Sequence, residues 1–165
     1  ILEYAGCILN GSKHYIRLEA ETRHYKSVLL GKRNILAQRL RIGVIIPTDG
    51  LRLDEKYYLG GQYSLRGYRD KSIGPDSLQD EHYGEILVNF NIENRLNILI
   101  NWWVVVFFDM GYLDNRDNIF RSSYFKISTC FGLRYYTPIG PIRADFGIPI
   151  KDKGREFYLG IYHIF

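Results

Sequence analysis

The side chains best suited to chemistry in this chain are two acids, Glu93 and Asp109, and one arginine, Arg66. Two neighbouring carboxylates can serve as general acid and general base when one of them keeps its proton at neutral pH. An arginine beside them opposes this role, because its positive charge favours the ionised form of both acids. These residue types therefore favour an ion-pair network over proton transfer.

Other combinations that could support catalysis are missing from the sequence. The two cysteines, Cys7 and Cys130, match no metal or redox spacing, and neither a Gly-x-Ser-x-Gly motif nor a phosphate-binding loop is present. The histidines also lack the spacing of metal ligands; they are His14, His24, His82 and His163. We expect no enzyme activity, no metal and no cofactor.

The composition indicates a protein built from strands. The 165 residues suit a single domain, and they include 46% hydrophobic, 15% aromatic and 24% charged residues, with 16 glycines and one methionine. The apolar content is therefore carried largely by aromatic and β-branched residues, which favour strands. The net charge of +4 would allow a nucleic-acid partner, but the basic residues alternate with acids along the predicted strands. This alternation favours a mixed-charge barrel lumen, so we expect no nucleic acid.

Alternation of polar and apolar side chains is the clearest pattern in the chain. Over residues 85–97 the odd positions are mostly polar and the even positions mostly apolar. A soluble strand averages about five or six residues, whereas a tilted membrane strand needs about nine to eleven. We predict strands over 1–9, 13–24, 34–47, 85–97, 102–112, 124–137, 141–150 and 155–165.

The connections between these strands alternate in length. Long polar stretches cover 49–83 and 113–122, whereas the turns near 98–101 and 137–141 are short, as in transmembrane β-barrels. No run of about 18 uncharged apolar residues could cross a membrane as a helix. We expect residues 1–165 to form one partial domain of an all-β, antiparallel, up-and-down transmembrane barrel. A soluble sandwich or lipid-binding domain is the alternative, because segment 102–112 is apolar on both faces and also suits a buried core strand.

Three segments in order resemble the BamA/TamA superfamily of outer-membrane assembly-factor barrels. Segment 58–75, which contains Arg66-Gly67-Tyr68, resembles the loop that enters the lumen in that family. Segment 102–111 resembles its Phe-x-Asp-x-Gly strand, and segment 132–145 resembles its hairpin with a Thr/Ser-Pro-x-Gly-Pro turn. The resemblance implies the C-terminal eight or so strands of a sixteen-stranded barrel, with loop 49–83 folded inward. Residues 69–75, the tryptophan pair and the chain ending are most similar to the TamA-like branch.

The resemblance also assigns roles to individual residues. It pairs the loop arginine, Arg66, with the acids at Glu93 and Asp109, and a guanidinium can bond carboxylates in bidentate fashion. Alternation supports the pairing, because it places Glu93 on the polar side of its strand. The loop glycines permit the tight backbone of a loop that folds back on itself; they are Gly60, Gly61 and Gly67.

The chain ends on an aromatic residue, as the terminal strand of bacterial outer-membrane barrels commonly does. Segment 156–165 resembles the β-signal of such proteins, and in the family this strand meets the first one in a weak seam. An incompletely paired edge can template an incoming strand through main-chain hydrogen bonds. The expected edge-strand residues are Tyr158, Gly160, Tyr162 and Phe165.

The resemblance implies a noncatalytic insertase in the outer membrane of a Gram-negative-type bacterium, with an organellar outer membrane as the less favoured location. Its partners would be outer-membrane protein clients and the lipid bilayer, with periplasmic or inner-membrane assembly partners attached through N-terminal domains. The first residues, 1–4, lack the features of a signal peptide, so we expect a fragment of a longer protein. A passive pore and a two-partner secretion transporter are the alternative functions.

Overall fold

The chain folds into long strands. The computed structural model describes residues 2–5, 15–28, 33–47, 55–118 and 124–161. Within these ranges, no helix is long and apolar enough to cross a membrane. The strands are β1 (Leu2–Ala5), β2 (Tyr15–Ser27), β3 (Asn34–Pro47), β4 (Asp76–Leu78), β5 (Glu81–Tyr83), β6 (Ile86–Leu99), β7 (Trp102–Asp114), β8 (Phe125–Thr137), β9 (Gly140–Pro149) and β10 (Glu156–Ile161).

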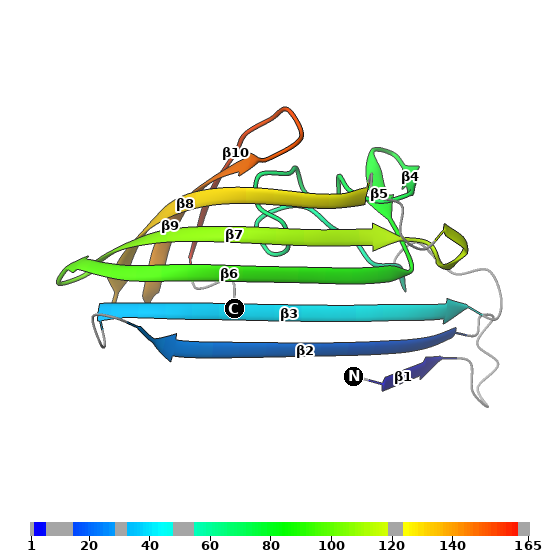
Figure 1. Ribbon diagram of the computed structural model, residues 1–165, viewed down its shortest axis with the longest axis horizontal. Helices are drawn as coiled ribbons and strands as arrows, with labels where there is room; N and C mark the ends of the chain where they lie inside the picture. The colour runs from blue at the N-terminus through cyan, green and yellow to red at the C-terminus, as the bar shows by residue number, and fades with distance from the viewer. Residues whose placement is uncertain (1, 6–14, 29–32, 48–54, 119–123, 162–165) are drawn as a thin grey trace.

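Eight of these strands form one antiparallel sheet in the order β1-β2-β3-β6-β7-β8-β9-β10. Each strand lies beside its neighbour in the sequence, apart from the small β4–β5 hairpin between β3 and β6. Figure 1 shows the long strands side by side and the sheet curling over towards β10. The all-β, antiparallel, up-and-down class predicted from the sequence is confirmed, and the sheet forms part of a barrel wall.

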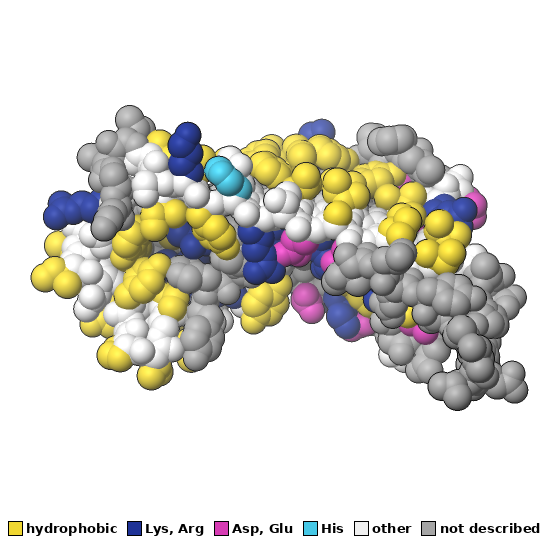
Figure 2. Space-filling view, turned by 90° about the horizontal axis from the view of Figure 1, so that it is seen from below, with side chains coloured by type: hydrophobic (Ala, Val, Ile, Leu, Met, Phe, Trp, Pro, Cys, Tyr) yellow, Lys and Arg dark blue, Asp and Glu magenta, His cyan; other side chains and the backbone are white. Residues whose placement is uncertain are grey.

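The alternation seen in the sequence separates the two faces of the sheet. The inner face is the one against which residues 55–75 pack, and along β6 it buries Leu87, Asn89, Asn91, Glu93 and Arg95. The outer face exposes large apolar side chains on β7 to β10; they include Val106, Phe131, Phe157 and Leu159. Figure 2 shows hydrophobic side chains gathered along the upper side of the molecule and charged ones near its centre. An apolar face of this extent suits contact with lipid.

Several strand limits differ from those expected. Strand β2 extends to Ser27, beyond the predicted end at 24, because its polar end keeps pairing with β3 as far as the Ser27 and Ile35 pair. Strand β6 extends to Leu99 through an irregularity between Asn97 and Leu99. The predicted loop 49–83 contains β4 and β5, which are three residues each and too short to show periodicity. Residues 1, 6–9, 13–14 and 162–165 of the expected strands lie outside the described residues.

The main apolar core lies between the inner face and the segment that connects β3 to β6. Leu59, Leu65 and Ile73 come from that segment and are at most 3% exposed. Small residues on the wall make room for them, because a Cβ at Gly111 would come within 2.8 Å of Leu59. The connection therefore packs as a folded element against the wall. The cluster comprises Tyr15, Ile45, Tyr57, Leu59, Leu65, Tyr68, Ile73, Leu87 and Leu113.

Candidate functional site

Arg66, Gly67 and Tyr68, here called the loop tip, sit on a tight turn of the connecting segment. Gly61 donates its N–H to the carbonyl of Tyr68 at 2.9 Å, which closes the turn. Gly60, Gly61 and Gly67 have φ angles of +115°, +85° and +92°, a region that favours glycine. The turn therefore needs glycine at the positions that the sequence singled out.

Arg66 lies deep between the loop and the wall, with 1% of its surface exposed. Its Nε and Nη2 donate to the two carboxylate oxygens of Asp109 at 2.7 Å each, and its Nη1 donates to Glu93 at 2.5 Å. The guanidinium carbon lies 3.4 Å from the ring centroid of Phe107. The structure thus brings together Arg66 and the two acids named in the sequence analysis.

Neighbouring side chains complete this cluster. Asn91 on β6 donates its amide to Asp109 at 2.8 Å and to the carbonyl of Ser64 at 2.7 Å. Arg95 donates to the second oxygen of Glu93 at 2.8 Å. The two acids thus face two arginines, so the formal charges of this buried group cancel. Buried charges need partners, and in this network each charge has one. The network therefore suits a structural role, in which it holds the loop against the sheet.

A second ionic cluster lies on β8 and β9, where Asp145 accepts hydrogen bonds from both Arg134 and Arg143. Arg143 also donates to the side chain of Gln62 in the loop at 2.9 Å. Gly160 on β10 makes room for this arginine, because a Cβ there would lie 2.8 Å from its Nε. The contact with Gln62 was not expected from the sequence.

The backbone of Gly67 lies directly against β9. A Cβ on Gly147 would collide with the N and Cα atoms of Gly67, and a Cβ on Gly67 would lie 3.1 Å from backbone atoms of Gly147 and Ile148. Only two glycines permit such a close approach of two main chains. The sequence analysis did not single out Gly147 as a contact of the loop.

Tyr68 connects the loop tip to the β9–β10 hairpin. Its hydroxyl donates to Asp152 in the hairpin turn at 2.8 Å, and its carbonyl accepts a hydrogen bond from the Tyr158 hydroxyl at 2.7 Å. Burial raises the pKa of Tyr68, and its hydrogen bond to Asp152 raises it further. Burial opposes ionisation of Asp152, but hydrogen bonds from Tyr68 and Lys126 outweigh it and lower the pKa of that carboxyl.

The expected edge-strand residues are only partly described. Tyr158 and Gly160 both lie on β10, at positions that pair with Asp145 and Arg143 of β9. Tyr162 and Phe165 lie outside the described residues. In the sheet of described strands, β10 has β9 as its one neighbour.

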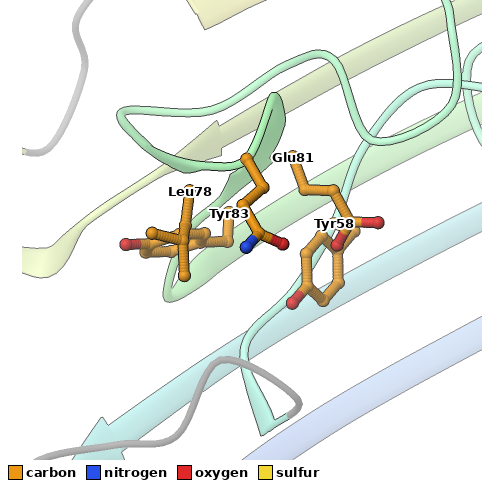
Figure 3. A pocket seen from close by; sticks show the side chains of 5 residues that line it. Tyr58, Leu78, Glu81 and Tyr83 are labelled. Atoms are coloured by element: carbon orange, nitrogen blue, oxygen red, sulfur yellow. The ribbon is translucent and has the colours of Figure 1, made fainter.

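Neither a metal site nor a ligand pocket stands out in the part of the chain that the structure describes. Its histidine, cysteine, aspartate and glutamate side chains form no group of three placed to hold a metal ion. A cavity of about 160 Å³ lies beside the β4–β5 hairpin, between Tyr58, Leu78, Glu81 and Tyr83 (Figure 3). Lys71 already donates to Glu81 at 2.9 Å and lies over the Tyr58 ring, so we assign this cavity to the packing of the loop.

The sheet is antiparallel and curled, its outer face is apolar, and an ion-paired loop lies on its inner face. These features define the wall of a membrane β-barrel with an inward-folded loop. The chain matches the model of the Omp85 superfamily domain over residues 1–165 and belongs to that superfamily. This agrees with the BamA/TamA resemblance, although the matches do not separate the TamA-like branch from the others.

Three relatives come from one bacterium and two yeasts. The outer membrane protein assembly factor BamA of Nitratidesulfovibrio vulgaris is 27% identical over 161 residues, covering 93% of this chain and 20% of the relative. A SAM50-like protein of Schizosaccharomyces pombe is 28% identical over 84% of this chain and 34% of its own length. The sorting assembly machinery 50 kDa subunit of Saccharomyces cerevisiae is 26% identical over 65% of this chain and 26% of its own length.

A solved structure shows the same fold. The crystal structure of BamA from Haemophilus ducreyi lacking POTRA domains 1–3 superposes with a TM-score of 0.71 at 21% identity, covering 88% of this chain and 34% of the other. The chain therefore spans about a third or less of the length of these relatives.

Proposed function

We propose that this chain is part of a noncatalytic factor that assembles or inserts other β-barrel proteins into an outer membrane. The observation that carries this proposal is that three relatives share this stretch of sequence. They are named as an outer membrane protein assembly factor, a SAM50-like protein and a subunit of a sorting assembly machinery. The sheet supports the proposal because its outer face suits lipid and its last described strand, β10, stands at the edge of the described sheet.

In the proposed mechanism, β10 offers its main chain to an incoming strand. Unpaired N–H and C=O groups on a strand edge can bind an extended segment by adding it to the sheet. Arg66, held by Glu93 and Asp109, takes no part in bond chemistry and instead fixes the loop against the wall. The proposed partners are outer-membrane protein clients, the lipid bilayer and assembly proteins that bind other domains.

The proposed location is the outer membrane of a Gram-negative-type bacterium. The bacterial relative supports this location, whereas the two yeast relatives belong to organisms without such an envelope. Fractionation of the source cells, with detection of the protein in the outer-membrane fraction, tests the location directly.

Reconstitution tests the function. The protein is placed in lipid vesicles, and the folding of an unfolded barrel client is followed by its shift in electrophoretic mobility without heating. The proposal expects faster client folding than in empty vesicles. A stable wide conductance without faster client folding would instead support a passive pore, and export of a dedicated soluble substrate would support a secretion transporter.

A further inference from the structure

One residue of the loop tip, Tyr68, contacts the β9–β10 hairpin at two separate places. Its hydroxyl reaches Asp152 in the turn at 2.8 Å, while its carbonyl accepts the Tyr158 hydroxyl from the middle of β10 at 2.7 Å. Lys126 on β8 donates to the same carboxylate, at 3.1 Å to Oδ1, so the turn is held from two sides. The hairpin turn and the middle of β10 are therefore both connected to the loop.

The same tip is fixed at its other end to strands in the middle of the sheet. Arg66 bonds Glu93 on β6 and Asp109 on β7, while Gly67 rests on the backbone of Gly147 on β9. Three consecutive residues thus span from β6 to β10 across the inner face. A displacement of β10 must therefore either break the Tyr158 bond or move a tip that buried ion pairs hold in place.

Among the described strands, β10 is paired on one side alone. Its six described residues pair with β9, whereas β6 and β7 have 13 or 14 residues and a paired strand on each side. Its outward side chains Phe157, Leu159 and Ile161 are more than half exposed, so they pack little against the protein. The inward Tyr158 hydroxyl therefore adds a hydrogen bond to the loop beyond the pairing of β10 with β9.

We propose that Tyr158 and Tyr68 are positioning residues that tether β10 to the loop tip. The tether would set how readily the edge of β10 becomes available for pairing with an incoming strand. The proposal rests on the function proposed above, since that function acts at this edge. Coupling of this kind is reciprocal. Loosening of the tip frees β10, and capture of β10 by a client strand weakens the hold on the tip.

Hydrogen exchange in the protein reconstituted in lipid vesicles tests the tether. Tyr158→Phe removes only the hydroxyl that bonds the loop carbonyl, and we expect the amides of β10 to exchange roughly fivefold faster, as for the loss of one ordinary hydrogen bond. Tyr68→Phe keeps that carbonyl but removes the bond to Asp152, so faster exchange is expected in the turn at 150–155. Tyr135→Phe, the same chemical change on the exposed outer face of β8, is the matched control and should leave both segments unchanged.

The pattern across the variants separates a tether from a general loss of stability. Faster exchange spread equally over β6, β7 and β10 would overturn the proposal, as would unchanged β10 exchange in the Tyr158→Phe variant. Client folding is measured on the same samples. The two proposals can fail separately. If the wild-type protein does not speed client folding, but β10 exchanges faster in the Tyr158→Phe variant than in the wild type, the tether is supported and only the proposed function is overturned.

Discussion

Arg66 and Asp109 form a bidentate ion pair, with two nitrogen–oxygen distances of 2.7 Å, between a loop and a strand that lie 43 residues apart in the chain. The backbone N–H of Arg66 adds a third contact, to Asp109 Oδ2 at 3.2 Å. The parallel N–H groups of a guanidinium match a carboxylate in a way that a lysine ammonium cannot. The pair therefore fixes both the position and the orientation of the loop tip.

Removal of the guanidinium should destabilise the loop strongly. In Arg66→Ala, two buried carboxylates lose their shared partner, and breaking a buried pair of this kind costs about 3–5 kcal/mol. We expect a lower midpoint of thermal unfolding, a loosened loop and slower client folding. The control is Arg23→Ala, whose arginine is 51% exposed in its pair with Glu21 and should contribute about 0–1 kcal/mol. Equal losses in both variants would contradict this assignment.

Glu93 and Asp109 should act as one unit with Arg66. Glu93→Gln and Asp109→Asn each leave the arginine with one acid, so the second substitution acts on a network that is already disturbed. We expect the double variant to depart from the sum of the single variants by about 0.5–3 kcal/mol in unfolding free energy. Strict additivity would show that the two acids hold Arg66 independently.

A methyl group at Gly147 should lift the loop tip from the wall. Gly147→Ala places a Cβ against the main chain of Gly67, which cannot rotate away, and overpacking of this kind costs about 1–3 kcal/mol. Faster trypsin cleavage at the exposed Arg69 would report the displaced loop. At Gly154 an added Cβ would meet nothing within 4 Å, so Gly154→Ala should leave that cleavage rate near the wild-type value even if its φ of +139° strains the turn.

The contact between Tyr68 and Asp152 should weaken in acid. Hydrogen bonds lower the pKa of Asp152 below its ordinary 3.8, so its contribution to stability is complete above that value and is lost as the pH falls through the folded-state pKa. Protection of the turn at 150–155 should therefore be constant near neutral pH and fall below about pH 4. In Asp152→Asn this acid-dependent step should disappear, and a step of the same size in that variant would assign it to another group.

The alternation of polar and apolar residues was enough to predict the long strands of the sheet and the inward position of Glu93. The period of two along 85–97 puts Glu93 on the polar face, because successive side chains of a strand point to opposite faces. It says nothing about the β4–β5 hairpin, whose strands are three residues each. Conformation in such short segments is set by contacts with the rest of the protein.

The parts of the site that sequence reasoning missed depend on how distant strands come together. Gly147 lies under Gly67, and Tyr158 reaches Tyr68, only because the sheet curls and sets β9 and β10 against the same loop. Tyr158 was expected only as an edge-strand residue, and nothing in its own strand indicates a contact with Tyr68. The curl is a property of the whole sheet, so no local pattern contains it.

The direction of the loop-tip contacts along the chain has a consequence for how the protein is made. Arg66 and Tyr68 find their partners 27, 43, 84 and 90 residues later, at Glu93, Asp109, Asp152 and Tyr158. Synthesis therefore produces the tip well before these four partners, and its contacts with them can form only as later strands are added. Because Tyr158 is the farthest of these partners along the chain, its bond to the tip can form only after β10 has been added.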